Sequence, residues 1–434
     1  MTAIVDPRHL RPPCDREGDT RLAVEYPATD YVREFAASII GSGDLVSELP
    51  HDLSEAIFRC LTRRQELGVP QTGVQDDWER QFPDSQAREA LCVPRLDMAV
   101  RTWVRRNRPG LWEERCRSRW PDGKRFALCL THGVDFVTRY CVSTRDCWEV
   151  VRRILRASNG RAELAVPAAR LMAKYLLHPF LAPSFRRDEY WHYEDWLKLE
   201  DSHGFKSTLF FLAGNLPSPR KWDTCYDHHS RILFDGRRMT VREMIREIGS
   251  RGWDIGLHGS YDSALDVAAL IDEKRQIEDS CGEQVLGIRQ HYLHYDVSIT
   301  PRVQNEAGLR VDSTQGFTRV TGFRAGTSFP YFCWDPKEGR RLDVLEVPQH
   351  AMDGALFMDS ALGYDTQTAV SHMLKLTDAV AEMGGCLTLN WHANWLNNPA
   401  YWDTYAALLS EAKSRNAWGC SIRQLYEWWL GRCA

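Results

Sequence analysis

Six side chains with catalytic or metal-binding chemistry lie where the sequence predicts the ends of strands. Histidines and carboxylates in such places can hold a divalent metal ion or transfer protons, and an arginine can stabilise a negative charge. The carboxyl ends of parallel strands meet at one rim of an α/β barrel, where active sites are built. We therefore expect one site made of Asp135, His258, Arg289, His291, Asp312 and His392.

The strands that must position these residues are short apolar runs separated by helical patterns. Thr240 and Glu243 have the spacing of a capping box that opens one of the helices, and Ser263 and Asp266 repeat this spacing. Repeated strand–helix–strand units predict parallel strands with right-handed crossovers, and hence a barrel or an open sheet. The expected strands are 126–131, 207–213, 253–258, 285–289, 309–312, 342–347 and 386–391.

The beginning of the chain has a different pattern, in which apolar residues recur at helical spacing between Pro- and Gly-containing breaks. We therefore expect a helical accessory region at 1–120, followed by the barrel at 121–434. A helical insertion in the barrel is expected at residues 146–200. The predicted helices of the accessory region cover 31–40, 53–66 and 87–106.

The composition is that of an ordinary folded protein. The 434 residues include 55 basic and 59 acidic side chains, so no overall positive field favours a nucleic acid or an anionic membrane. No apolar run predicts a membrane span, and the first 21 residues lack the apolar stretch of a secretory signal. The 13 cysteines include no Cys-x-x-Cys pair, and without an export signal we expect reduced thiols and a cytoplasmic protein.

Several strings of residues carry a resemblance to a known family. They read Leu-Thr-His-Gly-Val-Asp at 130–135, Gly-Leu-His-Gly-Ser-Tyr-Asp at 256–262, Gly-Ile-Arg-Gln-His-Tyr-Leu at 287–293, Gly-Phe-Arg-Ala-Gly-Thr at 322–327 and Leu-Thr-Leu-Asn-Trp-His at 387–392. In this order they resemble the polysaccharide deacetylases, or NodB-homology domains, of carbohydrate esterase family 4. The accessory region lies outside the resemblance.

The resemblance implies a distorted (β/α)7 barrel that holds one divalent metal ion and hydrolyses an N-acetyl group of an amino sugar. By the family's pattern, Asp135, His258 and Asp262 would hold the ion, and the residue two places before Asp135 would be the general base. His392 would protonate the leaving amine, and Arg289 would orient the base and stabilise its charge.

Two positions depart from the family's pattern. The position of the base is occupied by Gly133, and the second histidine of the metal pair is replaced by Asp262. The first difference predicts weak activity on simple acetamides, with His132, Asp262 or a substrate group as alternative proton acceptors. The second difference makes the ligands richer in oxygen, so that Mn, Fe and Co are candidates beside Zn. His291 is an alternative third ligand, although a structural role would also explain it.

Further residues near these strings are expected to contact the substrate. Arg324 would bind either an anionic substrate group or a buried carboxylate. Asp312 would either cap a turn or support the site through its neighbours. The flat rings that could stack on a sugar face are those of Tyr292, Trp391 and Trp395.

Together these features predict a metal-dependent hydrolase that acts on an N-acetyl type of amide in a sugar-containing small molecule or glycan. One alternative is a tailoring enzyme that uses the same metal site for other chemistry. Another is a catalytically silent barrel that binds a carbohydrate or a protein partner. Gly133 favours both alternatives, but a pure binder has no need for a metal-and-acid set, so Asp135, His258, Arg289 and His392 favour an enzyme.

Overall fold

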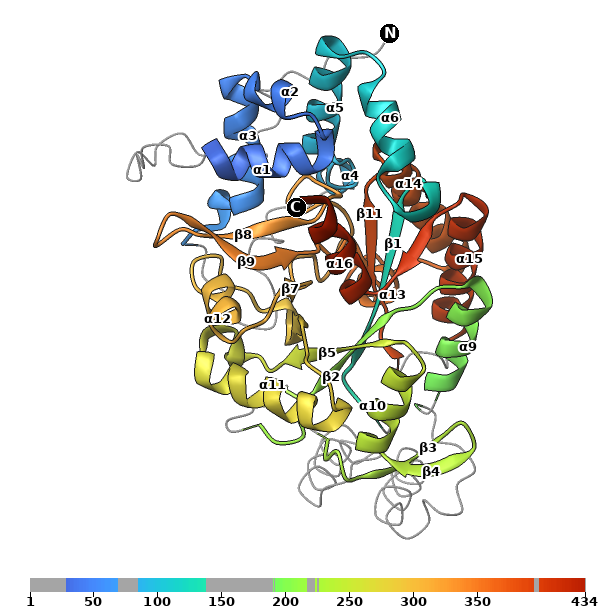
Figure 1. Ribbon diagram of the computed structural model, residues 1–434. Helices are drawn as coiled ribbons and strands as arrows, with labels where there is room; N and C mark the ends of the chain where they lie inside the picture. Colours follow the sequence, from blue (N-terminus) through green and yellow to red (C-terminus); the bar gives the residue numbers. More distant parts are fainter. Residues whose placement is uncertain are drawn as a thin grey trace, which may run out of the picture.

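The computed structural model describes residues 29–68, 85–137, 190, 192–216, 223–224, 226–393 and 398–433. Trp395 and most of the insertion predicted at 146–200 lie outside these residues. The described chain begins with helices and continues as alternating strands and helices, as the sequence predicts (Figure 1).

Ten strands of the described chain form one curled sheet. Their order is β10-β11-β1-β2-β5-β6-β7-β9-β8, with β12 paired to the beginning of β1. All pairs in this sheet are parallel except β8 with β9. This curled, mostly parallel sheet with helices between its strands confirms the predicted α/β class and forms a half-barrel. The strands are β1 (Ala127–Val134), β2 (Thr208–Leu212), β5 (Asp254–Gly259), β6 (Gly287–Gln290), β7 (Val311–Asp312), β8 (Tyr331–Asp335), β9 (Arg340–Glu346), β10 (Ala351–Met352), β11 (Cys386–Asn390) and β12 (Trp418–Cys420), while β3 (Arg231–Phe234) and β4 (Arg237–Thr240) form a separate hairpin.

Helices connect the strands of the sheet. None of them, in the described part of the chain, is long and apolar enough to cross a membrane. They are α9 (Tyr193–His203), α10 (Val241–Ser250), α11 (Val267–Cys281), α12 (Thr300–Glu306), α13 (Asp353–Phe357), α14 (Thr366–Met383), α15 (Pro399–Ser414) and α16 (Ile422–Cys433), with the short 3-10 turns η6 (Asp262–Leu265) and η7 (His291–Leu293).

The helix starts test the two predicted capping boxes. Thr240 and Glu243 form the box at the start of α10, where each side chain accepts a hydrogen bond from the other residue's backbone N–H. The second prediction is wrong, because Ser263 lies in the 3-10 turn η6 and α11 begins only after Asp266. The Asp266 carboxylate caps α11 by accepting hydrogen bonds from the N–H groups of Ala268 and Ala269.

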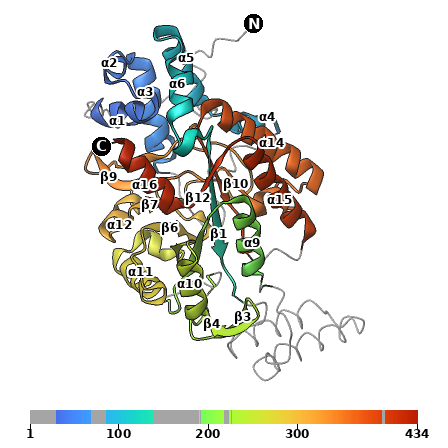
Figure 2. The same ribbon diagram turned by 45° about the vertical axis from the view of Figure 1, so that its right-hand side comes forward.

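The N-terminal helices pack against the end of the sheet at which β1 begins, opposite the β3–β4 hairpin (Figures 1 and 2). Ile39 and Val100 share a buried apolar cluster with Ala127 and Cys129 of β1. A common core therefore joins this region to the barrel, and the division into two domains at residue 120 stays a prediction. The helices are α1 (Thr29–Ile40), α2 (Gly43–Ser47), α3 (His51–Thr62), α4 (Ser85–Leu91), α5 (Arg95–Asn107) and α6 (Leu111–Ser118), with the turns η2 (Arg64–Glu66) and η4 (Pro121–Gly123).

Buried polar contacts also join the N-terminal helices to the barrel. The Glu66 carboxylate accepts hydrogen bonds from Arg63, three residues earlier in the chain, and from Arg324 Nη2 at 2.6 Å. The Asp97 carboxylate accepts bonds from the backbone N–H and the hydroxyl of Ser328, at 2.8 and 2.6 Å. Removing one partner of such a contact would leave a buried charge unpaired, which is strongly destabilising. These contacts therefore tie the N-terminal helices to the barrel.

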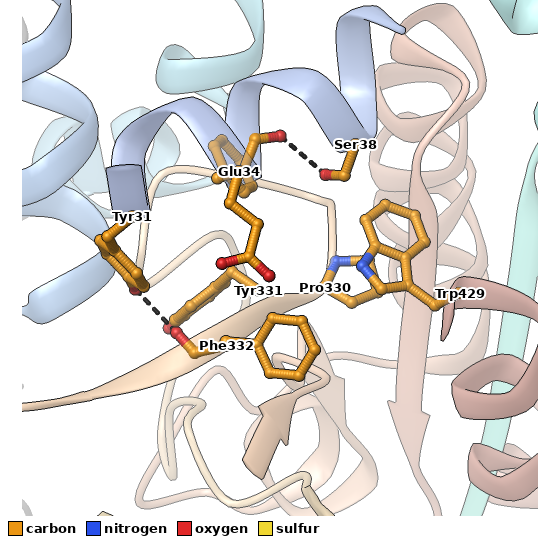
Figure 3. Close-up of a pocket in the computed structure, with 8 residues that line it drawn as sticks. Tyr31, Glu34, Ser38, Pro330, Tyr331, Phe332 and Trp429 are labelled. Carbon is orange, nitrogen blue, oxygen red and sulfur yellow. Dashed lines mark hydrogen bonds between the residues drawn. The ribbon is translucent and has the colours of Figure 1, made fainter. Parts of the chain in front are cut away.

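A small pocket lies at the same interface, between α1 and β8 (Figure 3). The Tyr31 hydroxyl donates a hydrogen bond to the Phe332 carbonyl oxygen at 2.7 Å. The Glu34 carboxylate is paired with the Arg341 guanidinium, with 3.3 Å between Oε2 and Nε. Tyr31 and Glu34 of this pocket thus hold α1 to the sheet.

Candidate functional site

Four of the predicted site residues gather where the strands end. Asp135 follows β1, His258 is on β5, His291 follows β6 and His392 follows β11. His258 Nε2 is 3.2 Å from Asp135 Oδ1, and His392 Nε2 is 3.8 Å from Asp135 Oδ2. The rings of His258 and His291 pack edge to face, with 5.1 Å between their centroids.

The two atoms of Asp135 and His258 that face each other, Oδ1 and Nε2, both carry lone pairs, and no proton lies between them. His258 Nδ1–H donates to the Arg289 carbonyl oxygen at 2.8 Å, so Nε2 carries the lone pair of the neutral ring. Burial lowers the pKa of His258 and outweighs the opposing effect of Asp135. Burial acts to raise the pKa of Asp135, but the neighbouring imidazole groups, His392 foremost, outweigh it and the pKa is lowered. The buried oxygen Oδ1 of Asp135 therefore has no hydrogen-bond donor among the described residues.

This arrangement fits two ligands of a divalent ion, because a carboxylate and a neutral imidazole nitrogen are both metal donors. The third ligand is less well defined. Neither Asp262 on η6 nor His291 completes a group of three metal-competent side chains within the described residues. His291 is the better placed of the two, since its ring contacts that of His258.

Asp223 orients His291 and was not predicted from the sequence. His291 Nδ1–H donates to Asp223 Oδ1 at 3.0 Å, which leaves Nε2 as the ring nitrogen that can accept a proton or a metal ion. The same oxygen accepts a hydrogen bond from the Tyr261 N–H at 3.1 Å. Asp223 belongs to no recognisable motif, so the sequence holds no signal for this contact.

Asp353 orients His392 in the same way. Its carboxylate accepts bonds from His392 Nδ1–H and from the His392 backbone N–H, both at 2.7 Å. Burial acts to lower the pKa of His392, but the carboxylates of Asp353 and Asp135 outweigh it and raise the pKa to about 9. The two carboxylates thus favour the protonated form of His392, whose Nε2 is turned toward Asp135. Asp353 follows β10, a strand of two residues that is too short to predict.

Gly133 lies between these groups. A β-carbon at residue 133 would be 2.9 Å from His392 Cδ2 and 3.6 Å from His258 Nε2. A side chain at this position would therefore point directly into the site. His132, the next residue back, has its ring nitrogens bonded to the Trp391 carbonyl and to Glu200, at 2.8 and 2.7 Å. Successive residues of a strand face opposite sides, which removes His132 as the proton acceptor.

Arg289 and Asp312 are buried in the wall of the barrel. The Arg289 guanidinium donates to Thr131 Oγ1 at 2.6 Å and to the carbonyl and hydroxyl oxygens of Ser313, both at 2.9 Å. Asp312 is paired in the sheet with Glu346, and burial raises the pKa of both carboxyl groups. Arg289 thus braces β1 against the residue that follows β7, and Asp312 supports the wall rather than facing the metal-type ligands.

The predicted substrate contacts are placed unequally. Tyr292 is exposed beside His291, with 4.3 Å between the ring centroids. Trp391 is fully buried and donates to the Tyr401 carbonyl at 3.2 Å, so its face is not open to a sugar. Arg324 binds the buried Glu66 carboxylate, which matches the second of its two predicted roles. The predicted substrate contact of Trp391 is thus wrong, because its ring is buried. For Arg324, burial against Glu66 rules out the contact with an anionic substrate group.

The fold and these contacts define a half-barrel. At the rim formed by the C-terminal ends of its strands lies a site made of carboxylate and imidazole groups. Solved structures with a similar chain course include a protein from Mycobacterium smegmatis assigned to the polysaccharide deacetylases, at 18% identity over 72% of this chain and 93% of that one, with a TM-score of 0.45. A protein from Pseudomonas aeruginosa with the same assignment is 16% identical over 72% of this chain and 93% of its own, also with a TM-score of 0.45. The PuuE allantoinase is 15% identical over 73% and 93% of the two chains, again with a TM-score of 0.45. No protein-family model and no curated protein matches the sequence.

Proposed function

We propose that this protein is a metal-dependent amide hydrolase of the deacetylase type, which removes an N-acetyl type of group from a sugar-containing substrate without the family's usual base. The observation that carries the proposal is the convergence of Asp135, His258 and His392 around Gly133. Three elements distant in the sequence supply these side chains. A binding barrel has no need for this set.

In this proposal each side chain has one task. Asp135 and His258 would hold a divalent ion, with His291 as the favoured third ligand. When bound, the ion would polarise the amide carbonyl and lower the pKa of a water molecule. His392 Nε2–H would donate a proton to the leaving amine, while Asp353 keeps the ring in place through Nδ1.

Metal binding is expected to depend on His258. Purified protein supplied with Zn or Mn should hold close to one equivalent, and His258→Ala should hold less than about a tenth of that, because a site of three ligands loses one of them. Elemental analysis after gel filtration measures this directly. His203→Ala removes a partly exposed histidine on α9, outside this cluster, and should leave the content unchanged.

The same measurement separates the candidate third ligands. His291→Ala should lower the metal content if His291 is the ligand, whereas Asp262→Ala should then have little effect. Equal metal content in wild type and His258→Ala would show that the ion, if any, is held elsewhere.

A carboxylate at residue 133 is expected to increase deacetylation. Gly133 does not have a positive φ angle, so an aspartate can adopt its backbone conformation, although its β-carbon would lie 2.9 Å from His392 Cδ2 and the His392 ring must shift to admit it. Gly133→Asp should raise the rate on N-acetylated chitooligosaccharides by about tenfold or more, because a positioned base contributes at least that much. Acetate release with metal present is the measurement.

Two control variants separate charge from shape. Gly133→Ala adds only the β-carbon, and Gly133→Asn adds an amide of the same shape as aspartate, so neither should raise the rate. Fast deacetylation by wild type that Gly133→Asp leaves unchanged or lowers would place the base elsewhere. If no variant has activity on any amide, while the protein still binds the sugars, the silent-barrel alternative is the better one.

A further inference from the structure

Several large exposed apolar side chains lie on the chain segments that also carry the site residues. Among the described residues six such side chains are exposed, and scattered single ones would be ordinary. Four of the six, however, lie on segments that directly follow the carboxyl ends of β1, β5, β6 and β10. These four, which we call the apolar rim, are Phe136 (42% exposed), Leu265 (44%), Tyr292 (37%) and Met358 (44%).

The apolar rim shares its segments with the site residues. Phe136 directly follows Asp135, and Tyr292 directly follows His291. Leu265 ends the turn that follows β5, the strand of His258. Met358 directly follows α13, the helix that begins with the Asp353 carboxylate that holds His392. In the sheet β5 pairs with β6, whereas β2 lies between β5 and β1, and β11 lies between β1 and β10. Because these strands are all parallel, the four segments leave the sheet at the same rim, where Asp135, His258 and His392 also meet.

The backbone at Tyr292 is strained, and its conformation turns the tyrosine ring toward the surface. Tyr292 and Leu293 have φ angles of 57° and 53°, in the left-handed region that costs a residue with a β-carbon about 1–2 kcal/mol. Leu293 is buried, whereas the Tyr292 ring is turned outward while it remains beside the His291 ring. Two consecutive strained residues that are not glycine are typical of ligand sites, where the surrounding structure enforces the strain.

We propose that the substrate of this site carries an apolar alkyl or aryl group that lies on the apolar rim while its amide is held beside His392. This inference rests on the proposed function and adds the class of substrate. The rim and the site are continuous along the chain, and the Tyr292 ring contacts that of His291, so that one molecule can occupy both. Leu265 and Met358 offer aliphatic surface rather than flat rings, which suits an alkyl chain better than a sugar face. The chain belongs either to the acyl group or to the aglycone.

Binding of two compound series by the full-length protein tests the inference without requiring turnover. One series is the methyl, butyl, hexyl and octyl β-glycosides of N-acetylglucosamine, below their micelle concentrations. The other is glucosamine acylated with acetyl, butanoyl and hexanoyl groups. Titration calorimetry in the presence of the metal should show affinity that rises about fourfold for each added CH₂ in one series, as expected for buried methylenes. The series that responds identifies the source of the apolar group.

The variants Leu265→Gln and Met358→Gln should flatten this dependence on chain length. Ile271→Gln is the matched control, since Ile271 is 45% exposed but lies on α11, away from the apolar rim. Because all three side chains are exposed, the variants are expected to fold. An equal effect of Ile271→Gln, affinity independent of chain length, or no binding in either series would overturn the inference.

Two further outcomes keep this inference apart from the proposed function. Deacetylation that is indifferent to chain length would leave the function standing and refute the apolar rim. Binding that depends on chain length, without hydrolysis of any amide, would support the apolar rim and refute the proposed function. Sedimentation with phosphatidylcholine–phosphatidylglycerol vesicles that is lost in Leu265→Gln and Met358→Gln would mean that the rim meets a membrane surface, and would also refute a role in substrate binding.

Discussion

Replacing His392 with alanine is expected to lower kcat for deacetylation by about 10² to 10⁴-fold. His392 is the group at this site whose N–H faces the space beside Gly133, and a positioned acid contributes a factor of this size. The measurement is turnover of the best N-acetylated substrate, with wild type and variant at equal metal content. KM should change much less, because the proton is transferred only in the transition state.

Two companion variants make the result interpretable. Asp353→Asn keeps the size of the side chain but weakens its hold on the His392 ring, so it should lower kcat by less than His392→Ala and change the pH profile. His392→Gln retains a hydrogen-bond donor and should fold like wild type, as thermal unfolding can show. Full turnover by His392→Gln would exclude the role as acid. Unfolding of both His392 variants would identify a core histidine instead.

Replacing Glu66 with glutamine is expected to lower the free energy of unfolding by about 3 to 5 kcal/mol. Glu66 is the buried carboxylate that binds two buried guanidinium groups, Arg63 and Arg324, and its loss leaves both cations without that partner. Denaturant unfolding measures the change. Glu338→Gln is the matched control, because its pair with Arg340 is exposed to solvent and should contribute little to the free energy of unfolding.

The effect of Glu66 is also expected to depend on pH. Burial acts to raise the pKa of Glu66, but Arg324 and Arg63 outweigh it and lower the pKa from 4.5 to about 2. The folded state thus favours the ionised form, and its contribution is complete above pH 4.5 and is lost as the pH falls toward 2. The difference in stability between wild type and Glu66→Gln should shrink over this range. A difference that is constant with pH would mean that packing, not charge, is responsible.

The Glu66 pair depends on a contact that the linear sequence does not contain. Glu66 and Arg324 are 258 residues apart, and no periodicity relates them. The residues around Arg324 are compatible with a substrate anion as well as with a buried carboxylate. The packing of the N-terminal helices against the start of the barrel is what decides between these roles.

The strands, and the phase of the reactive residues along them, follow from the amino-acid sequence alone. A buried parallel strand is a short apolar run, and its end is visible where polar residues begin, so the pattern of residue types suffices to assign Asp135, His258 and His392 to one rim. The sequence pattern places the start of α11 too early. Ser263 has the spacing of a capping box, and Asp266 is an equally suitable N-cap, so the pattern does not distinguish them.

The side chains that hold the site in place depend on how distant segments pack together. Asp223 and Asp353 orient His291 and His392, yet neither has a local pattern, because a hydrogen bond between distant segments requires proximity and not spacing. The strand geometry likewise separates His132 from Gly133, since neighbouring residues of β1 face opposite sides of the sheet. The sequence alone therefore determines the strands and the reactive residues at their ends. The pairing of distant charges and the exposure of the apolar rim arise only when the strands curl into one sheet.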